Sequence, residues 1–244
     1  TLWTKTIDGP LNDYGLHIEE TSDSGFIITG HTYSFVNPGS LGVYLIKLDS
    51  MGNLEWTQTY GGDLHGDQGM CVKQTSDGGY AICGMGGDIG STTFGGSGCG
   101  LLIKTDNLGN VEWSKSFGTI EGGYAEDMVI TNDGGYLIFG NMSTTDPLPL
   151  GYLLKLNAVG DVIWLKGYSD ISARSIAASS DTTYLLNGES FSGGGNLLME
   201  VNALGDTLFT KKYDAMAYLE VQVSNNSDIS MVGNGAFVKT NNLG

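Results

Sequence analysis

The chain has 244 residues, with 39 glycines, four prolines, and 27 acidic side chains against 11 basic ones. This length allows one large all-β domain or two ordinary domains, and the glycine content indicates many tight turns. The net charge of −16 argues against nucleic acid and anionic membrane surfaces as partners, because both need clusters of Lys and Arg. There is no run of about 18 apolar residues, so we expect no membrane insertion.

Four short segments near the N-terminus show the alternation of apolar and polar residues that predicts β-strands. They are "GLHIEE" (15–20), "GFIITG" (25–30), "YLIKL" (44–48) and "NLEWTQT" (53–59), with Gly-, Asp- and Ser-rich stretches between them. We name these segments strands A, B, C and D of one unit.

The same unit recurs along the chain. The stretch "LDSMGNLEW" (48–56) has relatives that share a turn glycine followed, four residues later, by Trp or Phe. These relatives are "TDNLGNVEW" (105–113), "LNAVGDVIW" (156–164), "VNALGDTLF" (201–209) and the incomplete "TNNLG" (240–244). The turn glycines are 57, 51, 45 and 39 residues apart, and a repeat of this size with four short strands is typical of a β-propeller blade.

The repeats predict an all-β fold, a five-bladed β-propeller with four antiparallel strands per blade, formed by residues 1–244 as a single domain. The blades are expected at 14–60, 67–117, 124–168, 172–213, and 219–244 plus 1–6. The N-terminal strand would complete the C-terminal blade, because "TLW" at the N-terminus matches "TLF" in the fourth copy. Such closure removes free sheet edges. Alternatively, the chain is a fragment of a longer array.

The Asp- and Asn-rich stretches are interpreted as turns rather than metal or catalytic sites. Asp49 precedes Gly52 by three residues, which is typical of a type I turn followed by a left-handed residue. A calcium loop would need carboxylates at alternate positions, whereas other copies have Asn in the first place. The three cysteines, Cys71, Cys83 and Cys99, have no CxxC spacing and are expected to be buried apolar side chains.

A binding site is expected on the face formed by the D–A and B–C loops, where the sequence departs from its own repeat. Aromatic and carboxylate side chains gather in these loops, and together they suit sugars, by stacking and by accepting hydroxyl hydrogen bonds. The candidate ligand-binding residues are Tyr14, Tyr33, Phe35, His65, Asp67, Phe94, Tyr124, Glu126, Asp127, Phe191 and Tyr218. The alternative is that these are solvated acidic loops held in place by aromatic side chains.

No catalytic residue is assigned and a metal site is left open. Asp63 and Asp67 could chelate Ca²⁺, and no other cofactor is expected. The histidines have no zinc-site spacing, and no G-x-S-x-G motif is present.

The pattern "W-x-x-x-[YF]-G-G … DGGY-x-I-x-G … LIK-x-D-x-x-G-N-x-x-W" resembles the SBBP-like propeller repeats of bacterial and archaeal cell-surface and secreted proteins. Its C–D hairpin is also similar to the tryptophan docking repeat of quinoproteins. The resemblance covers nearly the whole chain and implies an extracellular or cell-surface binding or adhesion module, with no active site carried over. The sequence departs from these families in having five blades, and it lacks the adjacent cysteines of quinoprotein dehydrogenases.

Three functions remain open. The leading hypothesis is a non-enzymatic, lectin-like propeller that binds a neutral glycan or a protein. The second is a glycoside hydrolase, for which Asp13, Asp67, Glu126, Asp127 and Glu220 would supply carboxylates in a central funnel. The third is a structural subunit of a surface layer or filament.

Overall fold

The computed structural model describes residues 3–7, 9–62, 66–86, 99–117, 123–142, 150–192, 194–214, 220–224, 228–233 and 236–240. These residues form β-strands and turns, and they contain no helix. In this part of the chain, accordingly, no helix is long and apolar enough to cross a membrane. Contacts divide the chain into two compact units, Thr1–Ala125 and Glu126–Gly244, and each unit is described by itself.

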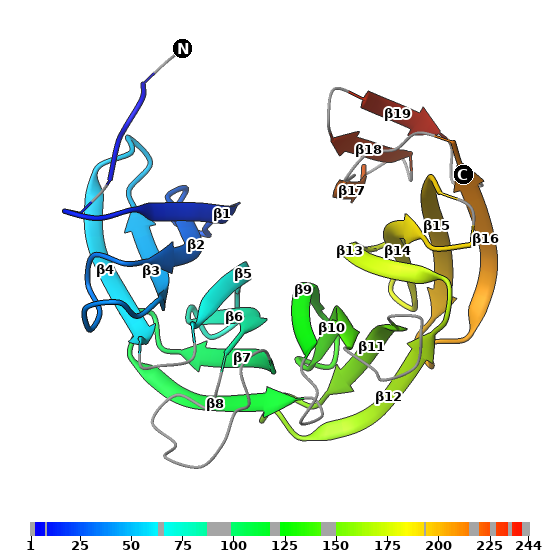
Figure 1. Ribbon diagram of the computed structural model, residues 1–244, viewed down its shortest axis with the longest axis horizontal. Coiled ribbons are helices and arrows are strands. Elements are labelled where there is room, and N and C mark those ends of the chain that lie inside the picture. Colours follow the sequence, from blue (N-terminus) through cyan, green and yellow to red (C-terminus); the bar gives the residue numbers. More distant parts are fainter. Residues whose placement is uncertain are drawn as a thin grey trace. The chain divides into compact units, whose positions relative to one another are not determined.

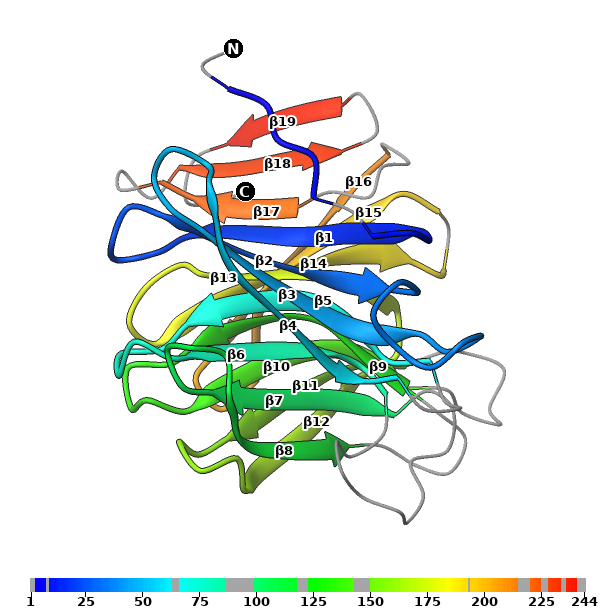
Figure 2. The ribbon, with the colours of Figure 1, turned by 90° about the vertical axis from the view of Figure 1, so that its left-hand side faces the viewer.

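Unit 1 contains two antiparallel sheets of four strands each, in which neighbours in sequence are neighbours in the sheet (Figure 1). The first sheet consists of β1 (Asp13–Glu20), β2 (Phe26–Thr32), β3 (Gly42–Leu48) and β4 (Leu54–Gly61). The second consists of β5 (Gln68–Gln74), β6 (Tyr80–Met85), β7 (Gly100–Thr105) and β8 (Val111–Phe117). Figure 2 faces the first sheet and shows β1 to β4 in this order.

The remaining strands form three sheets with the same meander order. The third sheet consists of β9 (Gly123–Ile130), which begins at the boundary of the two units, β10 (Tyr136–Met142), β11 (Leu150–Leu156) and β12 (Val162–Tyr168). The fourth consists of β13 (Ile171–Ala178), β14 (Thr183–Ser190), β15 (Asn196–Asn202) and β16 (Thr207–Tyr213). The fifth has three strands, β17 (Glu220–Val223), β18 (Ile229–Gly233) and β19 (Ala236–Thr240).

Five successive antiparallel meanders confirm the predicted all-β fold, a five-bladed β-propeller. The strand predicted over residues 1–6 is not seen where the structure describes it, because residues 3–7 form no strand. Residues 1, 2 and 241–244 lie outside the described residues. Closure of the fifth blade by the N-terminus therefore stays a prediction.

The predicted hairpin turn is confirmed at the first C–D connection. Gly52 has a φ of 77°, and its N–H donates to the carbonyl of Asp49 at 3.0 Å. The Asp49 carboxylate accepts the N–H groups of Met51 and Asn53, at 2.9 and 2.7 Å. This carboxylate stabilises the turn and needs no metal to do so.

A Trp and a Tyr on β4 link the first sheet of unit 1 to the β7–β8 hairpin of the second sheet. Trp56 on β4 contacts the Tyr80 ring on β6, with centroids 5.8 Å apart, and covers Gly109 in the β7–β8 turn. The Tyr60 hydroxyl donates to the Gly109 carbonyl at 2.7 Å. Apolar side chains of the two sheets fill the space behind this contact, including Ile27, Val43, Leu45, Val72, Ile82 and Leu101. The repeated W-x-x-x-Y spacing thus encodes contact between blades.

The N-terminal segment makes the same contact on the first sheet. Trp3 lies against Gly52 and packs edge-on against Phe26, with ring centroids 6.0 Å apart. Ile7 joins the cluster of Tyr44, Ile46 and Leu48. Residues 3–7 therefore cover the first sheet as a D strand of a preceding blade would.

The strand-C lysines of unit 1, Lys47 and Lys104, are buried and form ion pairs. Lys104 is 5% exposed, and its ammonium contacts Asp77 at 2.8 Å and Glu112 at 2.9 Å. Burial raises the pKa of the Asp77 carboxyl, but hydrogen bonds from Lys104, Thr75 and the Gly79 N–H outweigh it and lower the pKa to about 2. Lys47 makes the equivalent contacts with Asp23 and Glu55 in the first sheet.

We expect Asp77→Asn to lower the free energy of unfolding at pH 7 and to flatten its dependence on pH. Because the folded-state pKa lies below the unfolded value of 3.8, the stabilisation is complete above that value and is lost as the pH falls toward 2. The carboxylate is 56% exposed, so the expected effect is about 0.5–1 kcal/mol. Urea unfolding at pH 7, 4 and 2.5 checks this prediction. It would be contradicted if the free energy of unfolding changed with pH by the same amount in both proteins.

We expect Ser24→Gly to stabilise the protein by about 1 kcal/mol. Ser24 has a φ of 63° in the first A–B turn, whereas the second and third sheets have Gly78 and Gly134 there, at 86° and 75°. A glycine removes the left-handed strain that a Cβ introduces. Urea unfolding provides the measurement, with Ser22→Gly as control, which should destabilise slightly by adding freedom to the unfolded chain.

Candidate functional site

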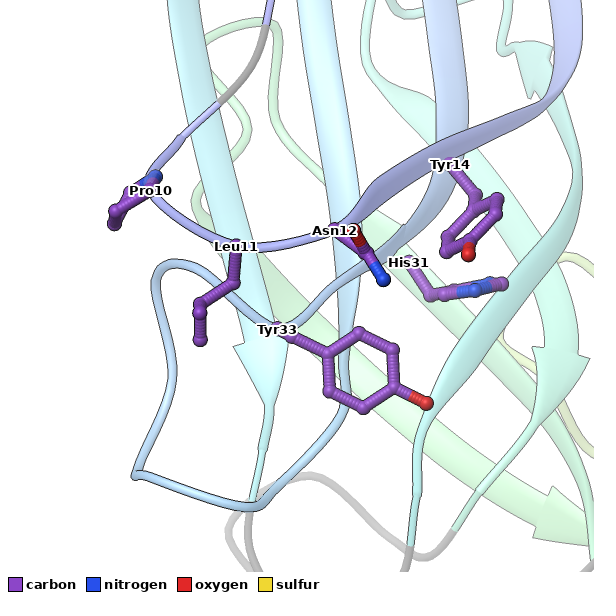
Figure 3. Close-up of a pocket in the computed structure, with 6 residues that line it drawn as sticks. All are labelled: Pro10, Leu11, Asn12, Tyr14, His31 and Tyr33. Carbon is purple, nitrogen blue, oxygen red and sulfur yellow. The ribbon is translucent and has the colours of Figure 1, made fainter.

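A pocket lies at one end of β1 and β2. Tyr14 and His31 are direct partners across these strands, and the Tyr33 N–H donates to the Asn12 carbonyl at 3.1 Å. Because side chains alternate between the faces of a sheet, Asn12, Tyr14, His31 and Tyr33 point to the same side. Together with Pro10 and Leu11 they line a pocket of about 590 Å³ (Figure 3).

The pocket wall is fixed from the other face of the sheet by Asp13. Its carboxylate accepts hydrogen bonds from the Gly9 N–H at 2.7 Å, the Thr32 hydroxyl at 2.5 Å and the Ser34 hydroxyl at 3.0 Å. Ser34 Oγ in turn accepts the Leu11 N–H at 2.9 Å. Burial raises the pKa of the Asp13 carboxyl, but these hydrogen bonds outweigh it, so the pKa is lowered and Asp13 stays ionised. These hydrogen bonds therefore hold the segment that carries Pro10 and Leu11 in place without a ligand.

Three rings form the floor and sides of the pocket. The Tyr14 and His31 ring centroids are 4.7 Å apart with planes tilted by 34°, and Tyr33 stands nearly perpendicular to His31, at 87° and 6.3 Å. Figure 3 shows the Asn12 amide pointing between these rings. Tyr14 and Tyr33 are 48% and 38% exposed, so much of their ring surface is open to a ligand.

The described lining residues combine apolar faces with polar groups, and none of them carries a carboxylate, ammonium or guanidinium. Burial lowers the pKa of His31, and the negative charge of Asp13 only partly opposes this shift, so His31 is neutral at pH 7. The rings and Leu11 offer apolar surface, while Asn12 and the phenol hydroxyls offer hydrogen bonds. Such a lining fits an uncharged ring that bears hydroxyl groups.

The aromatic pocket is not repeated at the equivalent positions of the second and fourth sheets. The partners that correspond to Tyr14 and His31 are Gln68 and Met85 in the second sheet. In the fourth sheet they are Ser172 and Glu189. Of these three sheets, only the first has an aromatic pair at this position. The pocket therefore depends on residues in which the blades differ from one another.

The structure brings together Tyr14 and Tyr33 of the predicted site residues and adds His31, which was not predicted. Phe35 is 49% exposed and packs against Tyr44, with centroids 5.5 Å apart. Tyr124 is half-buried on β9, and Phe191 is 38% exposed just after β14. The predicted His65, Phe94 and Tyr218, together with Asp63, lie outside the described residues.

The predicted carboxylates bind groups of the protein itself. Buried Asp67 accepts the Gly62 N–H at 2.9 Å. Glu126 pairs with Arg174 at 2.9 Å, and burial raises the pKa of Glu126 against the opposing effect of that arginine. Arg174 also contacts Glu189 at 3.4 Å. Their role in ligand binding, and the Ca²⁺ site suggested for Asp67, stay predictions.

Asp127 occupies a position at which successive inner strands are hydrogen-bonded. Its carboxylate accepts the N–H of Ile176 on β13 at 2.9 Å. Ser175 Oγ likewise accepts the N–H of Val221 on β17 at 2.8 Å. In unit 1, His17 Nδ1 accepts the N–H of Val72 on β5 at 3.4 Å. In these three sheets the residue at this position accepts a backbone N–H, which gives Asp127 a structural role; the second sheet has Cys71 there.

No protein-family model matches the chain, and no curated protein matches its sequence. Solved structures are similar to the chain in fold. The chain is similar to the structure of the Dos1 propeller, with a TM-score of 0.62 and 12% identity, over 94% of this chain and 69% of that one. It is also similar to an apocarotenoid oxygenase from Synechocystis, with a TM-score of 0.52 and 11% identity, over 94% of this chain and 58% of that one.

A chimera of apocarotenoid oxygenase and RPE65 matches with a TM-score of 0.51 and 11% identity, over 88% of this chain and 55% of that one. The chain thus spans little more than half the length of these two oxygenase structures. At such identities the likeness shows the fold alone. The class of protein defined by the sheets and by these neighbours is a β-propeller.

Proposed function

We propose that the chain is a non-enzymatic binding domain whose pocket at Tyr14, His31 and Tyr33 takes a neutral glycan. The observation that carries this proposal is the pocket itself, whose described lining residues supply three aromatic rings, an amide and no charged side chain. A pyranose ring presents an apolar CH face and a rim of hydroxyls, and these complement the tyrosine faces and the Asn12 amide.

Charge supports an uncharged ligand. The described lysines of unit 1 that show ion pairs, Lys47, Lys73 and Lys104, contact carboxylates of their own unit. The single arginine of the chain, Arg174, belongs to unit 2 and contacts Glu126 and Glu189. An acidic sugar would enter a protein with a net charge of −16 and meet no cation among the lining residues that the structure describes.

Binding is favoured over hydrolysis by the state of the carboxylates. A glycoside hydrolase needs two carboxyl groups free to protonate the leaving group and to attack or activate water. Of the five candidates, Asp13, Asp67 and Asp127 instead accept backbone N–H groups, Glu126 pairs with Arg174, and Glu220 accepts the Gln222 amide. The proposed setting is the cell surface or the extracellular space, which rests on the resemblance to the SBBP-like and quinoprotein-like repeats; a protein ligand or assembly into a surface layer remains the alternative.

We expect Tyr33→Ala to weaken binding of a neutral glycan by about tenfold, because one stacking face is lost. A glycan array with the whole chain identifies the ligand, and calorimetry then measures its affinity. Phe191→Ala is the matched control, since Phe191 follows β14 as Tyr33 follows β2, with the same 38% exposure. Equal losses in both variants would place the site elsewhere, and release of shortened sugars would favour the hydrolase.

A further inference from the structure

His31 is the most unusual side chain in the pocket. Its Nδ1 atom is buried, and in the described part of the chain it has no hydrogen-bond partner. The imidazole lies beneath the Tyr14 ring at 4.7 Å and beside Tyr33 at 6.3 Å. The nitrogen is thus shielded by the rings that form the pocket.

The two protonation states of His31 are unequal in this position. A neutral imidazole can carry its proton on Nε2 and leave Nδ1 as a bare acceptor, so that only one acceptor lacks a partner. A protonated imidazole places an N–H donor and part of a positive charge on Nδ1, where neither water nor an acceptor reaches it. Protonation therefore requires that the ring turn or that Tyr14 move away.

We infer that the pocket is competent for binding only with neutral His31, and that protonation separates the Tyr14–His31 pair and releases the ligand. This regulation rests on the proposed function, because it concerns the same site. Ligand and proton are then antagonists: acid weakens binding, and bound ligand disfavours protonation of His31 to the same degree.

The charged and titratable groups around His31 are few. Asp13, on the neighbouring strand, is the charged group that acts on it and favours the protonated form. Among the described residues, the other groups facing the imidazole are the Tyr14 and Tyr33 phenols, the Asn12 amide, and Val43, its partner on β3. Burial is the larger effect and lowers the pKa of His31 below 6.5.

The lowered pKa of His31 decides how the closed pocket depends on pH. The closed pocket is favoured fully above pH 6.5, and the preference is lost as the pH falls through the lowered pKa of His31. Below that midpoint, affinity should fall about tenfold per pH unit, as expected for one proton released on binding.

The experiment is a titration of the whole chain by NMR, following the His31 and tyrosine ring signals from pH 7.5 to 5. We expect a His31 midpoint below 6.5 and movement of the Tyr14 and Tyr33 ring signals with the same midpoint. His31→Phe identifies the His31 signal by its disappearance. Burial, assisted by the charge of Lys73, lowers the pKa of His17 to about 4, so the His17 signal should change little between pH 7.5 and 5.

A His31 midpoint of 6.5 or above, or tyrosine signals that ignore it, would overturn the inference. The titration without ligand tests whether protonation of His31 separates the rings, even if no glycan binds. If no glycan binds, the proposed function alone fails. Where a glycan binds, saturation should lower the midpoint further. His31→Phe should make the affinity constant between pH 7.5 and 5, whatever its absolute value, and persistent acid weakening in that variant would contradict the inference.

Discussion

Replacing Gly109 with alanine is expected to lower the free energy of unfolding by about 3 kcal/mol, well beyond the cost of turn strain. Gly109 has a φ of 79°, where any Cβ costs about 1–2 kcal/mol. A Cβ at this position would also lie 2.6 Å from Gln58 Cγ and 3.0 Å from Trp56 Cζ3. Forcing atoms into such a packed contact adds about 1–3 kcal/mol.

Gly78 is the control for this prediction. It has a φ of 86° in the A–B turn of the same sheet, but no atom lies within 4 Å of a Cβ added there. Gly78→Ala should therefore cost only the strain, about 1–2 kcal/mol. Urea unfolding followed by circular dichroism compares the two variants. Equal losses would show that contact with Trp56 contributes nothing at Gly109.

These glycines show how far the sequence alone leads. The spacing of glycine and tryptophan predicts the repeat, the turn type and the fold, because period-two alternation and turn chemistry are local properties of the chain. The repeat does not show that the tryptophan of one blade lies on the turn glycine of the next. That contact joins Trp56 to Gly109, residues far apart in sequence, and it appears only once the sheets are packed.

The candidate site was predictable in part for the same reason. Tyr14 and Tyr33 stand out as aromatic residues at positions where the repeat does not require them. His31 becomes recognisable only through its pairing with Tyr14 across β1 and β2, since the register decides which side chains share a face. The one signal in the sequence was His31 itself, a histidine directly after the strand-B glycine, and its spacing to Tyr14 means nothing without the register.

The acidic residues predicted the candidate site less well than the aromatic residues did. Their number in the loops suggests ligand-binding carboxylates, but the sequence does not reveal which backbone N–H groups lack partners. Asp127 meets that need on β13 and Asp13 meets it in the segment before β1. Residue type predicts what a side chain can bind, and the local hydrogen-bond demand decides what it does bind.

The second large effect is expected in unit 2, where Trp164→Ala should cost about 2–3 kcal/mol. Trp164 is half-buried on β12, packs against a core cluster that includes Leu137 and Leu153, and lies over Gly205, whose added Cβ would be 3.1 Å from its Cη2. Full burial of a tryptophan is associated with losses of about 3–5 kcal/mol on truncation, and half-burial reduces this range. The tyrosine contact beside it, from Tyr168 to the Gly205 carbonyl at 2.7 Å, should persist.

The chain supplies its own control for that substitution, because the fourth copy of the repeat has Phe209 where the third has Trp164. Trp164→Phe keeps an aromatic ring over the hairpin and removes only part of the side chain, so it should cost about 1 kcal/mol, less than truncation to alanine. Circular dichroism is the suitable probe, since removing a tryptophan alters the fluorescence. If Trp164→Phe destabilised unit 2 as much as Trp164→Ala, ring packing on the hairpin could not be the source of the stability, and the W-x-x-x-Y motif would need another explanation.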